Sequence, residues 1–257
     1  MMRIFELEDC LPALIVYTQK FSALVDAGVS LQTCFGLLQK TTDDPTVSSA
    51  NAYLRTEIIE KERTLSQAMA DRPDVFSPFY IAFIRAGEIG GVLDEAMAYL
   101  AGWLERERAA AAGLRSAWLL NQIAAQVLRK SPSQQGHTAV ETHLPDYRRV
   151  AQIASFCRLF EMCLTAGVPR NLALTTAAEV LGEPALAKLR TSVERLSSEE
   201  SIAPALGEVQ ELRPVIVGMV EIGEECGLLD RMLRRAADFY DAEAIHILHS
   251  AVRVEFG

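Results

Sequence analysis

The chain carries the same sequence pattern twice, and this duplication limits the folds that it can adopt. In the first half, a run of apolar residues leads to Ala27-Gly28-Val29, and in the second half a similar run leads to Ala166-Gly167-Val168. Further on, the stretch at residues 87–94 returns at residues 223–230. Because self-similarity of this kind marks one structural unit that is used twice, we expect two copies of one module.

The apolar spacing indicates that the repeated module is helical. Near the start of each copy, apolar residues recur at steps of three and four, which places them on one face of a helix. The aromatic content is 7%, and the period-two alternation of strands is scarce, so the composition also favours helices. The two stripes are Leu14, Tyr17, Phe21 and Leu24 in the first copy and Ile153, Phe156, Phe160 and Cys163 in the second.

Capping residues and helix breakers divide each copy into a series of helices. Ser30, Asp44 and Ser77 precede helical patterns as N-cap residues do, while Gly28 and the pair at residues 90–91 are suited to end helices. In the first copy we predict helices at residues 11–27, 31–40, 45–62, 66–70 and 78–86, followed by a long sixth helix. The fold class is therefore predicted to be all-α, with two tandem antiparallel six-helix bundles.

The boundaries between the copies follow from local composition. Residues 1–128 are predicted to form the first bundle with its long final helix, residues 129–146 a linker and residues 147–257 the second bundle. Residues 131–137 are polar and rich in helix breakers, which is typical of linkers. The first residues are acidic rather than basic and apolar, and no apolar run near the middle reaches the ~20 residues of a membrane span. We expect a soluble chain.

Charge, cysteines and motifs exclude several classes of function. The net charge of −9 argues against nucleic acid as a partner. The five cysteines form no C-x-x-C pair, which suits a reducing compartment. Phosphate-binding and hydrolase motifs are absent, and the single Glu-x-x-His pair of a di-iron bundle, Glu243 with His246, has no second pair to complete it. We predict that the chain is not an enzyme and has no obligatory cofactor.

The segment at residues 84–94, with Gly87, Glu88, Gly91 and Asp94, resembles the hallmark of the type II secretion F / PilC family, and residues 222–230 resemble it more loosely. This resemblance implies helical bundles that link an assembly ATPase to pilin or pseudopilin components at the bacterial inner membrane, with self-association of the subunits. Such proteins alternate their bundles with membrane-spanning helices, which this chain does not show. We therefore expect a cytoplasmic protein, or one that is peripheral at the inner membrane.

The two glycine–glutamate loops supply the candidate site residues. Glu88 and Glu224 are each expected to cap the free N–H groups of the helix that follows. The alternative is a divalent cation, Ca²⁺ or Mg²⁺, near Glu88, Asp94, Glu224 and Asp230, because such ions prefer oxygen ligands. The candidates for partner contact are Arg85, Glu88, Asp94, Glu221, Glu224, Glu225 and Asp230.

The two loops differ in charge, which suggests a different partner for each copy. Arg85 of the first copy corresponds to Glu221 of the second, and Ile89 corresponds to Glu225. One bundle is expected to meet the ATPase and the other a neighbouring subunit. A soluble helical scaffold that kept the fold without the secretion role is the alternative function. Three large aromatic residues, Phe79, Phe83 and Trp103, belong either to the core or to an interface.

Overall fold

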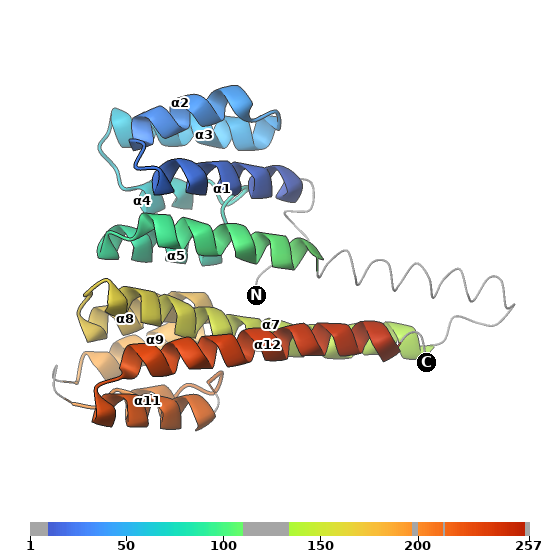
Figure 1. Ribbon diagram of the computed structural model, residues 1–257, viewed down its shortest axis with the longest axis vertical. Helices are drawn as coiled ribbons and strands as arrows, with labels where there is room; N and C mark the ends of the chain where they lie inside the picture. Colours follow the sequence, from blue (N-terminus) through green and yellow to red (C-terminus); the bar gives the residue numbers. More distant parts are fainter. Residues whose placement is uncertain (1–9, 110–133, 197–199, 213, 255–257) are drawn as a thin grey trace, which may run out of the picture.

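The computed structural model describes residues 10–109, 134–196, 200–212 and 214–254. These residues form helices joined by short loops, with no β-strand among them, and the predicted all-α fold is confirmed (Figure 1). The helices of the first half are α1 (Leu11–Asp26), α2 (Leu31–Thr41), α3 (Pro45–Ile59), α4 (Leu65–Ala70) and α5 (Pro78–Gly90), and a further helix covers residues 93–109.

Most helix starts in the first half follow from their capping residues, as predicted. The side chains of Ser30, Asp44 and Ser77 accept hydrogen bonds from backbone N–H groups in the first turns of α2, α3 and α5. Gly91 takes a left-handed conformation and ends α5. The prediction that the third helix continues to residue 62 is wrong, because α3 ends at Ile59 and Glu62 takes a positive φ of 54°.

The second half repeats this order of helices with two differences. Its first helix is much longer than α1, and a 3-10 turn follows its second helix. The elements are α7 (Gln134–Thr165), α8 (Arg170–Ala178), η2 (Glu179–Leu181), α9 (Glu183–Val193), α10 (Ala203–Gly207), α11 (Pro214–Cys226) and α12 (Leu229–Val254).

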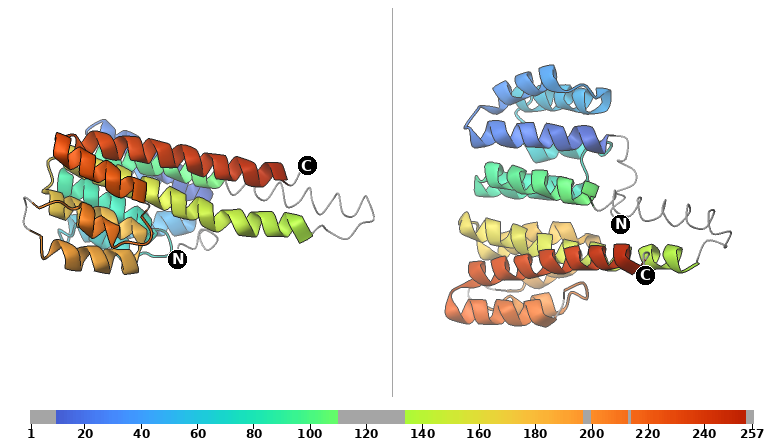
Figure 2. Two further views of the ribbon diagram at one scale, coloured as in Figure 1. Left: turned by 90° about the horizontal axis from the view of Figure 1, so that it is seen from below. Right: turned by 45° about the vertical axis from the view of Figure 1, so that its right-hand side comes forward.

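Part of the segment that we expected to be a linker is helical. Of residues 129–146, residues 134–146 belong to α7, which continues through the helix breaker Pro145, and residues 129–133 lie outside the described residues. Helix α7 packs along α12, and the two extend side by side beyond the other described helices (Figures 1 and 2). Packing between long helices can override local breakers. The exact domain boundaries stay a prediction.

The two halves are stacked on each other. Helix α5 of the first half contacts α7, α8 and η2 of the second. Helices α2 and α3 lie at one end of the stack and α11 lies at the other (Figures 1 and 2). None of the described helices is both long and apolar enough to cross a membrane.

The three large aromatic residues lie in the core, as one of the two interpretations predicted. Phe83 is fully buried, and Phe79 and Trp103 are exposed by 4% and 8%. The rings of Phe79 and Trp103 stack with centroids 4.2 Å apart, and those of Phe83 and Tyr99 stack at 4.5 Å. These aromatic pairs fix α5 against the helix at residues 93–109.

Candidate functional site

The glycine of each glycine–glutamate loop allows two helices to approach closely. A Cβ atom at Gly87 would lie 2.9 Å from Ala96 Cβ and 3.0 Å from Leu93 Cα. In the second half, a Cβ atom at Gly223 would lie 2.9 Å from Leu229 Cα. Any side chain at either position would push the next helix away, so the repeated glycine is a requirement of packing.

The glutamate that follows Gly87 caps a helix that comes earlier in the chain. One carboxylate oxygen of Glu88 accepts a hydrogen bond from Leu65 N at 2.5 Å. The other accepts from Ser66 N at 3.2 Å and from Ser66 Oγ at 2.5 Å. Leu65 and Ser66 begin α4, where a negative charge is favoured by the free N–H groups. The expectation that Glu88 caps the following helix is therefore wrong.

Glu224 performs the same task in the second half. Its carboxylate accepts hydrogen bonds from Ile202 N at 3.1 Å and from Ser201 Oγ at 2.5 Å, just before α10. In addition, Arg170 Nη1 donates to Glu224 Oε1 at 2.9 Å. Both glutamates thus hold the fourth helix of their bundle against the fifth. The position of Glu224 also differs from the expected capping of the following helix.

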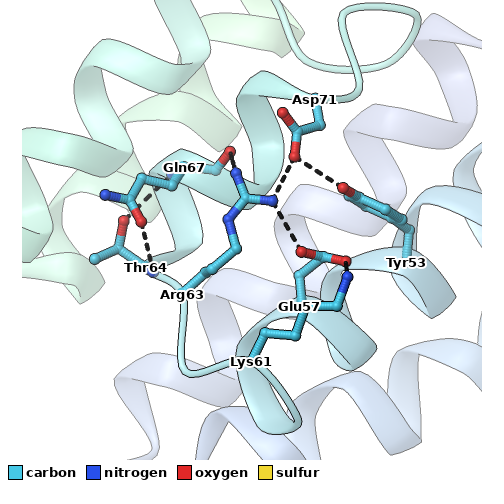
Figure 3. A network of polar contacts seen from close by, with 7 residues as sticks. All are labelled: Tyr53, Glu57, Lys61, Arg63, Thr64, Gln67 and Asp71. Atoms are coloured by element: carbon cyan, nitrogen blue, oxygen red, sulfur yellow. Dashed lines mark hydrogen bonds and ion pairs between the residues drawn. The ribbon is translucent and has the colours of Figure 1, made fainter.

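A polar network connects both ends of α4 with the residues around them (Figure 3). Thr64 and Gln67 form a capping box, in which each side chain bonds a backbone N–H group of the other residue. Arg63 Nη2 donates to the carbonyl oxygen of Gln67 at 3.1 Å. Its other terminal nitrogen donates to Glu57 at 2.8 Å and to Asp71 at 2.5 Å, which ties α3 to the end of α4.

Glu57 is a buried acid that stays charged because of its two cationic neighbours. Only 3% of the surface of Glu57 is exposed. Lys61 Nζ lies 2.5 Å from Glu57 Oε1, and Arg63 Nη1 lies 2.8 Å from Oε2. The hydrogen bonds from Lys61 and Arg63 lower the pKa of Glu57. No sequence pattern indicates this cluster, because its members are ordinary charged residues on a helix and a loop.

Arg85 joins the two halves of the chain. Its Nη1 atom lies 2.7 Å from Glu179 Oε1 and 2.9 Å from Glu179 Oε2, across the contact between α5 and η2. One turn further along α5, a Cβ atom at Gly90 would lie 2.9 Å from Ala166 Cβ and 3.6 Å from Val168 Cγ2. Arg85 was predicted as a partner-contact residue, and its side chain is instead engaged within the chain.

Arg85, Glu88 and Glu224 are half-buried and bonded within the chain, which leaves four of the seven candidate residues for contact with a partner. Asp94 is exposed in the first turn of the helix at residues 93–109, and Asp230 is half-buried in the first turn of α12. Glu221 and Glu225 are exposed on α11. The acidic surface expected in the second half thus consists mainly of Glu221 and Glu225, because Glu224 is occupied at α10.

The structure gives no support to the predicted cation site. The oxygens of Glu88 and Glu224 face N–H and O–H donors, whereas Ca²⁺ or Mg²⁺ would need several converging oxygen ligands. Within the described ranges, no group of three or more His, Cys, Asp and Glu residues is placed to hold a metal ion. A site near Glu88, Asp94, Glu224 and Asp230 stays a prediction.

Sequence reasoning also missed two polar contacts between the halves. Tyr147 of α7 donates a hydrogen bond to Glu107 at 2.7 Å, and Tyr99 and Ser155 are joined by hydroxyl groups 3.1 Å apart. Burial raises the pKa of Glu107, against the lowering effect of the bond from Tyr147. These partners lie far apart in the sequence, and no local pattern indicates them.

Comparison with known proteins agrees with this architecture. The family described as type II secretion system (T2SS), protein F matches residues 17–128 and 156–250, that is, both halves. The type IV pilus assembly protein PilC of Myxococcus xanthus is 24% identical over 307 residues, covering 92% of this chain and 72% of that protein. Type II secretion system protein F of Xanthomonas campestris is 22% identical, covering 93% and 75%.

A third relative, the type IV pilus assembly protein PilC of Thermus thermophilus, is 24% identical over 298 residues, covering 90% of this chain and 73% of that protein. These alignments are longer than the 257 residues of the chain, so the relatives carry internal segments that it lacks. The repeated glycine–glutamate loops fall within the matched residues of both halves. The chain belongs to the type II secretion system protein F family.

Proposed function

We propose that this chain is a non-enzymatic interaction module of a type II secretion or type IV pilus assembly machine. In this role it binds the assembly ATPase and neighbouring subunits, and acts together with pilin or pseudopilin components. It works in the cytoplasm or at the cytoplasmic face of the inner membrane. The observation that carries the proposal is the match of both halves to the family, together with the helix-capping glutamate that each half retains.

The hydrogen bonds of the repeated acids support a structural use rather than catalysis. The carboxylate oxygens of Glu88 and Glu224 accept hydrogen bonds at the starts of α4 and α10. What remains for recognition is a set of accessible acids at two places: Asp94 and Asp230 beside the loops, and Glu221 and Glu225 along α11. We assign the loops to the ATPase and α11 to a neighbouring subunit, in keeping with the different charges of the two copies.

Capture of the ATPase tests this assignment. The ATPase encoded in the same genome should be retained by the immobilised chain, and the variant Asp94→Lys/Asp230→Lys should retain much less of it. Glu60→Lys/Glu194→Lys is the matched control, because it reverses two exposed acids, one in each half, away from the loops. The variant Glu221→Lys/Glu225→Lys should capture as much ATPase as the wild type, because α11 is assigned to another partner. Equal capture by Asp94→Lys/Asp230→Lys would show that the proposal is wrong.

A soluble scaffold without a secretion role is the other candidate function. Chromosomal deletion of the gene distinguishes the two candidate functions. Loss of the proposed module should abolish pilus assembly or secretion, whereas loss of an unrelated scaffold should leave pilus assembly and secretion intact. Complementation with Glu60→Lys/Glu194→Lys should restore the phenotype.

A further inference from the structure

The contact between the halves shows how one copy of the module receives another. Helix α5 supplies Arg85, which pairs with Glu179, and Gly90, which lies against Ala166. The receiving surface is formed by α7, α8 and η2. The contact uses different surfaces on the two copies. Among the described residues, one surface of each copy is therefore left without an equivalent contact: α11 in the second half, and α1 with α2 in the first.

Helix α11 exposes the face that its counterpart α5 buries. On α5 this face includes Phe79 and Ala86, which are exposed by 4% and 0%. Their counterparts on α11, Val215 and Ile222, are exposed by 58% and 52%. On the following helix, buried Trp103 corresponds to Phe239, which is exposed by 59%. An apolar surface of this kind is typical of an interface whose partner is missing.

The surface of α1 and α2 differs from its counterpart in the same way. Ser155 and Thr176 of the second half are buried, with exposures of 1% and 4%. The corresponding residues of the first half are Val16 and Leu37, which are larger, apolar and exposed by 47% and 42%. The first half therefore exposes an apolar receiving surface.

Charge at the two unmatched surfaces is complementary. In the internal contact the arginine stands on α5 and the acid, Glu179, follows α8. At the counterpart of Arg85, helix α11 carries Glu221, and at the counterpart of Glu179, helix α2 carries Lys40. Both residues are exposed. Glu221 and Lys40 could thus form the same ion pair between two chains, with the acid on α11 and the base on α2.

We propose that this chain associates with further copies of itself head to tail, with α11 of one chain packed on the α1–α2 surface of the next. Of the helices concerned, α2 lies at one end of the stacked molecule and α11 lies at the other (Figures 1 and 2). Such a contact is heterologous, so it produces a ring or an open filament according to the rotation between chains. The proposal rests on the proposed function for its biological role, and it identifies the neighbouring subunit as a second copy.

A difference between the two copies at one position determines how closely two chains can approach in the proposed contact. The counterpart of Gly90 is Cys226, and the counterpart of Ala166 is Ala27. Because a Cβ atom at Gly90 would already lie 2.9 Å from Ala166 Cβ, the contact between chains must open slightly to admit Cys226. Disulfides need Cβ atoms roughly 3.5–4.5 Å apart. A cysteine at position 27 should therefore come within bonding range of Cys226 of the next chain.

Cross-linking of Ala27→Cys tests the geometry directly. Cys226 is exposed, and the other four cysteines are buried. With Cu(II)–phenanthroline as the oxidant, the two thiols lose two protons, and two copper complexes each take up one electron as the S–S bond forms. Non-reducing gels should show dimers and higher multimers. Glu60→Cys, at another exposed position, and Ala27→Cys/Cys226→Ser are the controls; cross-linking of Ala27→Cys no greater than in these controls would overturn the proposal.

A charge exchange tests the same contact without cross-linking. In sedimentation experiments on the full chain, Glu221→Lys and Lys40→Glu should each weaken self-association by roughly fivefold. The double variant Glu221→Lys/Lys40→Glu should recover most of the loss, which damage to folding would not do. A wild-type chain that stays monomeric at all accessible concentrations, or an exchange without recovery, would refute head-to-tail association. Capture of the ATPase by Asp94 and Asp230 is measured separately and can survive that result.

Discussion

Glu88 and Glu224 each support a helix that is too short to be stable alone. Helices α4 and α10 have six and five residues, and isolated helices of this length are not stable in water. The carboxylate of Glu88 satisfies two backbone N–H groups and one hydroxyl group at the start of α4. Loss of this acceptor leaves those donors without a partner in a partly buried place, which is costly.

We expect Glu88→Ala to lower the free energy of unfolding by about 1–3 kcal/mol, because it removes the acceptor of three hydrogen bonds. Urea unfolding followed by circular dichroism measures the change. The control is Glu95→Ala, since Glu95 is an exposed acid in the next helix. Equal stability of the two variants would show that the contacts of Glu88 contribute little.

At the residue scale, the sequence predicted which residues matter better than what they contact. The glycine–glutamate loops stand out because they occur twice, and close helix packing at Gly87 follows from the missing side chain. The partners of Glu88 lie 22 and 23 residues earlier in the chain, and Ile202 and Ser201 lie at the same distances before Glu224, while Arg170 lies 54 residues before it. Such separations carry no periodic signal, so the wrong helix was predicted to receive the cap.

Among the elements, the contact of α5 with the second half depends on the small size of Gly90. We expect Gly90→Ala to lower the free energy of unfolding by about 1–3 kcal/mol, because its Cβ atom would overlap Ala166. Gly36→Ala is a matched control, since a Cβ atom in that helix has nothing within 4 Å. That variant should stabilise the protein by about 0.5–1 kcal/mol. Thermal unfolding of both variants measures the difference.

The contact of the helix at residues 93–109 with α7 should depend on pH. Burial raises the pKa of Glu107 above its ordinary value of 4.5, so the folded protein holds this proton more tightly than the unfolded chain. The stabilising effect is complete below the unfolded pKa and is lost as the pH rises through the folded pKa. Glu107→Gln should therefore gain stability relative to the wild type as the pH rises from 4 to 7.

The expected gain is about 1.4 kcal/mol for each unit by which the pKa is raised. Unfolding in urea at several pH values measures it, with the exposed Glu95→Gln as the control. A constant difference between wild type and Glu107→Gln over this range would contradict the effect of burial on Glu107.

Helix boundaries were predicted correctly where they depend on local signals, and incorrectly where tertiary packing determines them. Ser30, Asp44 and Ser77 predicted three helix starts correctly, because a side-chain cap acts within its own first turn. The end of α3 and the start of α7 were not predicted. The first depends on Arg63, which bridges Glu57 and Asp71, and the second depends on packing along α12.

Across the whole molecule, the contact between the halves should make them unfold together. The pair of Arg85 with Glu179 and the close packing at Gly90 link them. We expect the wild type to unfold in one step and Arg85→Ala/Gly90→Leu to unfold in two, each with a smaller dependence on urea, because that dependence scales with the surface exposed. Fluorescence and circular dichroism should give coincident curves for the wild type and separate curves for the variant.

The tandem order itself was evident from the sequence, whereas the stacking of the halves was not. Repetition of the loops is visible in the letters, but the ion pair of Arg85 with Glu179 joins residues 94 positions apart. Nothing in the local pattern distinguishes that arginine from one that faces solvent.

The exposed face of α11 has a further consequence when the chain is compared with repeat proteins. Arrays of stacked repeats stay soluble because terminal capping repeats carry a polar outer face. Here the second half instead exposes the apolar side chains of Val215 and Ile222, and the first half exposes those of Val16 and Leu37. Within the described residues, the outer faces of both units are thus apolar rather than polar, so a high protein concentration should favour the stacking of further copies on these faces.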